Sequence, residues 1–180
     1  YNRAIEMARQ KPALLVFIHD DVLISDIFWT DRLHAGLKTF DIIGLAGNRC
    51  RFAGQPAWGF KSLTNNQFIW DNKTNLSGII GHGNTFPPSN LSIYGPPGLA
   101  VKLLDGVLLA SHSHTLIDSG LRFDERFKFH FYDMDFCRSA EKLNLTLGTW
   151  PLSAVHASGG NFKSDAWKAG YSLYLDKWTN

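Results

Sequence analysis

The stretch Ala13-Leu14-Leu15-Val16-Phe17-Ile18-His19-Asp20-Asp21-Val22 changes from wholly apolar to charged within two residues. Its six uninterrupted apolar residues predict a strand buried on both faces, as in a parallel sheet. Asp20 and Asp21 would then follow the C-terminal end of the strand, where open α/β sheets bind ligands. Adjacent carboxylates repel one another, and a divalent cation with phosphate oxygens in its shell relieves that repulsion. The alternative is that Asp20 or Asp21 caps a short helix over residues 22–25.

The composition favours one globular domain and gives no sign of a nucleic-acid or membrane partner. The chain has 180 residues, 44% of them hydrophobic, and a net charge of +2. Its basic residues are scattered, whereas a nucleic-acid surface needs them clustered. No apolar run approaches the roughly 20 residues of a membrane span. With no signal peptide at its start and only Cys50 and Cys137, we expect a reducing, cytoplasmic location. The composition is compatible with an oligomer as well as with a monomer.

Hydrophobic periodicity predicts alternating helices and strands around a long irregular region. Helices are expected over residues 2–10, 27–40, 113–119, 133–143 and 162–178, and strands over 13–18, 41–46, 67–70, 76–80, 145–149 and 152–156. The first strand, helix and strand after residue 13 predict a right-handed crossover with parallel pairing, and the strands at 67–70 and 76–80 predict a hairpin.

The irregular region spans residues 47–97, and so long a region in a compact domain usually carries function or mobility. Trp58 and Trp70 within it could either stack on a flat ligand or anchor the loops to the core.

Asp105 and Gly106 interrupt the apolar segment 101–110. Asp-Gly favours a hairpin turn. A bend that aims Asp105 into a crevice explains the pair equally well, because a carboxylate is costly to bury without a partner.

Asp133 and His156 extend the set of candidate site residues. Asp133 lies at the start of a predicted helix, where an acid either caps the helix or faces a ligand. His156 ends a predicted strand before a Gly-Gly turn, and by itself such a residue is more often a hydrogen-bonded core histidine than a ligand. Together with the acid pair, these residues occupy positions from which a shared crevice can be lined.

The chain resembles the family 2 glycosyltransferases of the GT-A fold from residue 2 to residue 160. The segments that carry the resemblance are Phe17-Ile18-His19-Asp20-Asp21-Val22, Asp105-Gly106, Phe123-Asp124-Glu125-Arg126-Phe127, Tyr132-Asp133-Met134-Asp135-Phe136-Cys137-Arg138 and Val155-His156. The resemblance implies a GT-A-like (Rossmann-like) mixed sheet with helices on both sides. It also implies an inverting transfer from a nucleotide-sugar donor to a carbohydrate or other hydroxyl acceptor, as in cell envelope polysaccharide synthesis.

The resemblance also implies a role for each site residue. Asp21 and His156 would bind Mn²⁺ or Mg²⁺, and mixed imidazole and carboxylate ligands suit Mn²⁺ better. Asp133 would be the general base. His19, Asp20, Asp105 and Gly106 would contact substrate, although His19 stands where many relatives carry an acid.

Members of the family normally begin with a strand, a helix and a strand that bind the nucleobase, and here only the end of that half is present. We therefore expect residues 1–180 to be a single domain that is a fragment of a longer GT-A domain. Two rival functions remain. A nucleotidyltransferase would also use acids and a metal, and a non-catalytic carbohydrate-binding relative would explain the many aromatic residues.

Overall fold

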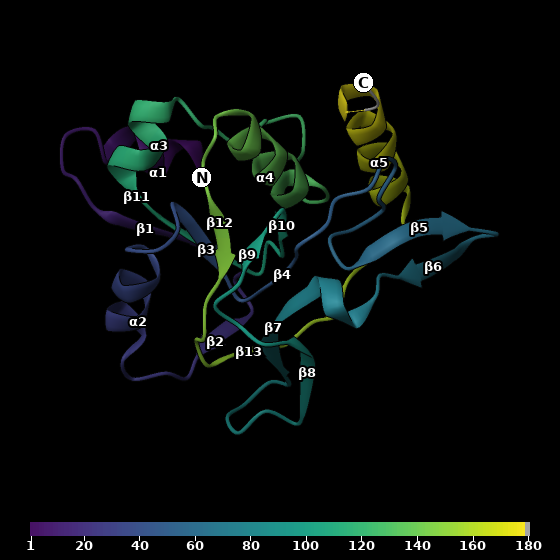
Figure 1. The fold of residues 1–180 in the computed structure, drawn as a ribbon, viewed down its shortest axis with the longest axis horizontal. Coiled ribbons are helices and arrows are strands. Elements are labelled where there is room, and N and C mark those ends of the chain that lie inside the picture. The colour runs from purple at the N-terminus through teal and green to yellow at the C-terminus, as the bar shows by residue number, and fades with distance from the viewer. Residues whose placement is uncertain (179–180) are drawn as a thin grey trace.

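The computed structural model describes residues 1–178 as a mixed α/β fold with two mixed sheets and a separate hairpin (Figure 1). The helices are α1 (Asn2–Met7), α2 (Trp29–Gly36), α3 (Ser113–Ser119), α4 (Tyr132–Lys142) and α5 (Asp165–Trp178), with a 3₁₀ turn, η1 (Lys73–Asn75). The strands are β1 (Leu14–Ile18), β2 (Val22–Ile24), β3 (Ile42–Gly44), β4 (Ala46–Asn48), β5 (Phe60–Thr64), β6 (Gln67–Trp70), β7 (Leu76–His82), β8 (Asn90–Gly95), β9 (Ala100–Val101), β10 (Leu103–Leu104), β11 (Leu108–His112), β12 (Leu147–Thr149) and β13 (Ala154–His156).

The strands divide between the two sheets so that each contains both parallel and antiparallel pairs. The first sheet has the order β1-β11-β3-β12-β9, in which only β12 and β3 run parallel. The second has the order β10-β4-β7-β13-β2, with β8 also paired to β7, and only β13 and β7 run parallel. The general expectation of an α/β fold with mixed strand pairing is therefore confirmed.

The prediction that the first strand is parallel and buried on both faces is wrong. β1 lies at the edge of its sheet and pairs antiparallel with β11, and only Phe17 among its residues is fully buried. β11 lies between β1 and β3 and is antiparallel to both. β1 and β3 therefore run in the same direction but do not form the pair that the predicted crossover required. Residues 22–25 form no helix; Val22–Ile24 is a strand, which removes the N-cap interpretation of Asp20 and Asp21.

The predicted hairpin between residues 67–70 and 76–80 is also wrong. β6 pairs with β5, and β7 pairs with β4, β8 and β13. The β5–β6 hairpin projects from the body of the molecule on the same side as α5 (Figure 1). Phe68 on the hairpin meets Trp167 on α5 with ring centroids 5.5 Å apart. The hairpin is therefore anchored by helix α5 and not by the strand that follows it in sequence.

The segment around Asp105 is a bend and not a hairpin turn. β10 pairs with β4 in one sheet, whereas β11 pairs with β1 and β3 in the other. Asp105 and Gly106 thus lie where the chain passes from one sheet to the other.

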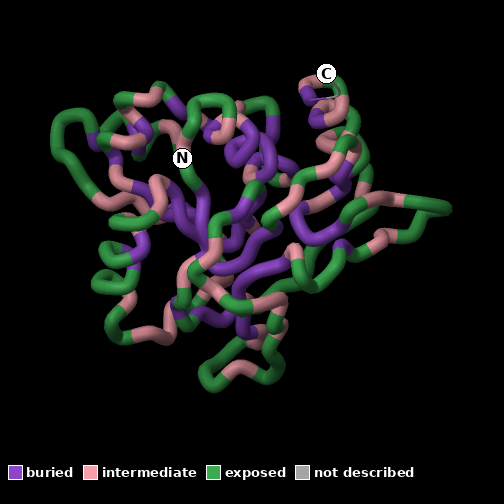
Figure 2. Tube along the Cα trace, viewed as in Figure 1, coloured by how far each residue is buried: buried purple, intermediate pink, exposed green. Residues whose placement is uncertain are grey.

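The core is continuous across both sheets. It contains β3, β10 and β11, together with the inner face of α4, and Figure 2 shows the buried segments gathered at the centre of the molecule. The helix predicted over 113–119 is confirmed, and it ends at Gly120, whose φ of +72° is a left-handed conformation that glycine adopts readily. Within residues 1–178, no helix has both the length and the apolar character needed to cross a membrane.

Candidate metal and catalytic site

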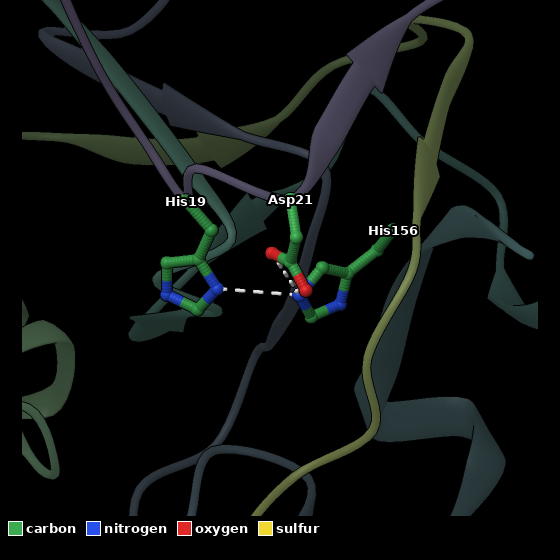
Figure 3. A group of neighbouring side chains, drawn as sticks. All are labelled: His19, Asp21 and His156. Atoms are coloured by element: carbon green, nitrogen blue, oxygen red, sulfur yellow. Dashed lines mark hydrogen bonds and ion pairs between the residues drawn. The ribbon is translucent and has the colours of Figure 1, made fainter. Parts of the chain in front are cut away.

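The side chains of His19 and Asp21, two positions apart, meet that of the distant His156 at one point (Figure 3). His19 follows β1, Asp21 precedes β2, and His156 ends β13. Antiparallel pairing of β13 with β2 sets His156 opposite Val22, directly beside Asp21. One ligand atom from each of the three residues lies within 4.8 Å of the other two. The acid after the first strand and the late histidine are thus neighbours, although 135 positions separate them in sequence.

Hydrogen bonding orients the His19 imidazole toward the cluster. The Tyr132 hydroxyl donates to the carbonyl oxygen of Gly106 at 2.8 Å, so its oxygen is left to accept from Nε2 of His19 at 3.0 Å. A proton on Nε2 gives the neutral ring a lone pair on Nδ1. That Nδ1 lies 3.3 Å from Nε2 of His156.

Nε2 of His156 lies 3.3 Å from Nδ1 of His19 and 3.2 Å from Oδ1 of Asp21. A proton on this Nε2 could be donated to either atom. A divalent cation in its place would have two imidazole nitrogens and one carboxylate oxygen as ligands. The residues therefore fit a divalent metal, and two imidazoles favour Mn²⁺ or Zn²⁺ over Mg²⁺.

The protonation states of the cluster suit metal binding. Burial lowers the pKa of His19, and the nearby carboxylate of Asp105 opposes this only in part. Hydrogen bonding to Ser158 lowers the pKa of Asp21, whose Oδ2 accepts from the Ser158 N–H at 3.0 Å. A neutral imidazole and an ionised carboxylate are the forms that ligate metals.

Asp20 does not join this cluster. It is exposed and lines a pocket of about 680 Å³ beside the end of β1, which we call the acidic pocket. The acidic pocket is lined by Tyr1, Asn2, Ile18, His19, Asp20, Asp21, Phe123, Asp124, Glu125, Phe127, Lys128, Phe129, Tyr132 and Ser158. Of the predicted acid pair, only Asp21 is a candidate ligand.

Asp133 lies in the first turn of α4 and lines a second cavity of about 320 Å³, the aromatic cleft. Its Oδ2 accepts from the Gly106 N–H at 3.0 Å, and its Oδ1 accepts from the Met134 N–H at 2.9 Å. Burial, reinforced by the charge of Asp105, raises the pKa of Asp133 to about 7. A carboxyl group with this pKa can accept a proton near neutral pH, as a general base must.

Gly106 allows α4 to approach this closely. A Cβ at position 106 would lie 2.7 Å from Cζ of Tyr132 and 3.0 Å from Cβ of Asp133. Phe131, which precedes both, has a φ of +66° and is held by stacking on Tyr171 and Tyr174 of α5. An unusual backbone conformation held by packing is typical of functional sites.

Asp105 also lines the aromatic cleft, and its side chain is fixed from two directions. Its Oδ2 accepts from Nε1 of Trp58 at 2.7 Å, and its Oδ1 accepts from the Val107 N–H at 2.9 Å. Trp58 is only 8% exposed, so its ring anchors the loop and orients Asp105, whereas Trp70 is 52% exposed and lines the cleft.

The candidate ligands His19, Asp21 and His156 lie between the two cavities. His19, Phe129, Tyr132 and Ser158 line both, whereas Asp21 belongs to the acidic pocket and His156 to the aromatic cleft. A cation held by the cluster would therefore reach ligands on either side.

Sequence reasoning gave no role to Tyr132 or Ser158, which position this site. It named His19 as a substrate contact, and the structure places this side chain among the candidate ligands. The only local signals were that Tyr132 precedes Asp133 and that Ser158 opens the turn after His156. Their contacts span more than 100 positions, beyond the reach of any spacing rule.

A scan of the chain against protein-family models finds no match, and a search of curated proteins finds no similar sequence.

Proposed function

We propose that this chain carries the catalytic residues of a metal-dependent inverting glycosyltransferase similar to the GT-A members of family 2. One observation carries the proposal: a ligand set of two imidazoles and a carboxylate lies beside a cleft that also holds an acid with a pKa near 7. The order of motifs along the chain, from the acid pair to the late histidine, supports it independently.

The acidic pocket suits the nucleoside diphosphate part of a donor. Its position on the Asp21 side of the cluster lets phosphate oxygens complete the shell of a cation held by His19, Asp21 and His156. The cation would stabilise the charge on the departing phosphate. Asp20 and Glu125 in the same pocket can accept hydrogen bonds from ribose hydroxyls, and Lys128 contributes a positive charge toward the phosphates.

The aromatic cleft suits the transferred sugar and the acceptor. Asp133 would take the proton of the acceptor hydroxyl as it attacks the anomeric carbon, a contribution of roughly 10²–10⁴-fold to the rate. The N–H groups of Gly106 and Met134 hold both of its oxygens in place. Because a single carboxylate acts on the acceptor, the anomeric configuration would be inverted.

The test measures metal binding, nucleotide binding and turnover on the same preparations. Mn²⁺ binding is followed by electron paramagnetic resonance, and nucleotide binding by thermal unfolding with Mn²⁺. A nucleotide at 100 times its dissociation constant adds about 2.7 kcal/mol to the stability. His156→Ala should abolish Mn²⁺ binding, whereas His34→Ala, which changes an exposed histidine on α2, should not.

Turnover is then measured with a panel of nucleotide sugars and hydroxyl acceptors. Asp133→Asn should retain binding of Mn²⁺ and nucleotide but lose transfer by at least about 100-fold. Release of pyrophosphate, unaffected by Asp133→Asn, would identify a nucleotidyltransferase instead. Binding of saccharides with no response to any nucleotide would favour a non-catalytic carbohydrate-binding protein. Failure of Mn²⁺ and every nucleotide to bind would overturn the proposal.

A further inference from the structure

The walls of the aromatic cleft combine many rings with an unusual charge balance. Within residues 1–178 the lining includes the aromatic residues Trp58, Phe60, Trp70, Tyr94, Phe129, Phe131, Tyr132, Phe162 and Trp167. Within residues 1–178 the lining also holds two carboxyl groups, of Asp105 and Asp133, and four histidines, but no lysine or arginine. Without a bound cation, a carboxylate or phosphate on a ligand therefore meets no permanently charged partner in the cleft, while the ionised carboxyl groups repel it.

Trp70 is a large ring of the cleft that is both open to solvent and fixed in position. Its side chain is 52% exposed although it lines the cleft. The indole packs on Phe60, with centroids 4.4 Å apart, and lies 6.1 Å from the ring of Tyr94. A Cβ at Gly59 would come within 2.6 Å of Cζ3 of Trp70, so the indole rests directly against the Gly59 backbone. The ring is thus fixed in position while part of its surface is left open.

We propose that the aromatic cleft binds a saccharide without negative charge, with one sugar ring stacked on the indole of Trp70. The apolar C–H face of a pyranose matches an aromatic surface, and its hydroxyl groups can donate to the carboxylates of Asp105 and Asp133. An amino sugar fits the same site, since an ammonium group is attracted by both rings and carboxylates. Uronic acids and sugar phosphates are disfavoured.

That this saccharide is the acceptor rests on the proposed function, whereas its binding does not. Asp133 lies in the same cleft as Trp70, so a stacked sugar would have its hydroxyl groups within the cavity that holds the general base. Trp70 is then a specificity-determining residue for the acceptor and takes no part in proton transfer.

The experiment compares ligands that differ only in charge. Methyl glycosides of glucose, galactose and mannose are titrated against the protein, with the matching 2-amino sugars and uronides, in buffer containing EDTA so that no metal adds positive charge. Binding is measured by calorimetry and by the indole N–H chemical shifts of the tryptophans, with Trp70 assigned from Trp70→Phe. We expect at least one neutral or amino sugar to shift the Trp70 signal, and its uronide to bind at least tenfold more weakly.

Substitutions then locate the site. Trp70→Ala should weaken binding about tenfold, and Trp70→Phe, which keeps a smaller ring on Phe60, should weaken it less. Phe28→Ala is the matched control, because Phe28 is 58% exposed and does not line the cleft. If Trp70→Ala does not fold, the Trp70 shift and the Trp70→Phe variant still decide the question.

Binding of the uronides as tightly as the neutral sugars, or the absence of any saccharide binding, would refute the inference. An affinity unchanged in Trp70→Phe, with no shift of the Trp70 signal, would refute the assignment to Trp70. If nucleotide and Mn²⁺ bind but no saccharide does, this inference fails while the proposed function stands. If saccharides bind but no nucleotide does, the proposed function fails and the cleft remains a saccharide site.

Discussion

Asp133→Asn should change the pH dependence of stability in a way that reports the environment of this carboxyl group. Burial and the charge of Asp105 raise the pKa of Asp133 from 3.8 to about 7 in the folded protein. Between these two values the folded chain holds a proton that the unfolded chain has released. The free energy of unfolding therefore falls as the pH rises from about 4 to about 7, and it stays low above that.

The size of the effect follows from the raised pKa. A pKa that moves from 3.8 to about 7 corresponds to about 4 kcal/mol, of which about 3 kcal/mol falls between pH 5 and pH 8.5. Asparagine cannot ionise, so the variant escapes this loss. The substitution also removes the acceptor of the Gly106 N–H, which donates to Oδ2 at 3.0 Å in the wild type. This loss costs about 1–3 kcal/mol of stability at every pH. The variant should thus be less stable than the wild type at pH 5 and gain on it steadily up to pH 8.5.

Urea unfolding followed by tryptophan fluorescence, repeated across this pH range with EDTA present, measures the difference. Asp124→Asn is the matched control of opposite sign, because hydrogen bonding to Arg126 lowers the pKa of Asp124. Its carboxylate stabilises the fold above pH 4, so that variant should be the less stable one throughout pH 5–8.5. If the stability difference between wild type and Asp133→Asn stays constant to within about 0.5 kcal/mol, the raised pKa and its role in a general base are refuted.

Two further substitutions test the packing that positions the site. Gly106→Ala should lower the free energy of unfolding by about 2 kcal/mol and abolish transfer, because the added methyl group would press on Tyr132 and Asp133. Gly159→Ala is the control, because nothing lies within 4 Å of its added methyl group, and its urea midpoint should not change. Equal midpoints for the two variants would contradict this prediction. Lys177→Met should lower the free energy of unfolding by about 3 kcal/mol at pH 7, because Lys177 pairs at 2.7 Å with the buried carboxylate of Asp135. Oδ2 of Asp135 has no hydrogen-bond partner within residues 1–178, and burial raises the pKa of this group. The loss should therefore be smaller in acid, where Asp135 can take up a proton. Lys168→Met removes a pair with fully exposed Asp165 and should leave the stability unchanged when both lysine variants are unfolded in urea. A similar loss of stability in both variants would disprove the importance of the buried pair.

Local sequence patterns were sufficient to predict several elements of the fold and several candidate residues. The unbroken apolar run predicted strand β1 and placed Asp20 and Asp21 directly after its C-terminal end. The helix over 113–119 with its glycine stop, and the helix with acids in its first turn, follow from side-chain preferences within a few residues. Candidate residues Asp21, Asp133 and His156 were identified in the same way, and the structure places all three around the adjoining cavities.

Strand pairing and the meeting of distant side chains depend on long-range packing that local patterns do not predict. An apolar run has the same pattern at a sheet edge as at its centre, so the antiparallel edge position of β1 could not be predicted. The orientation of the His19 ring toward Asp21 and His156 depends on a hydrogen bond with Tyr132, 113 positions away. Trp58 likewise holds Asp105 through a hydrogen bond across the bend between the two sheets. Such contacts arise from the packing of distant segments, and local preference carries no information about which segments will be neighbours.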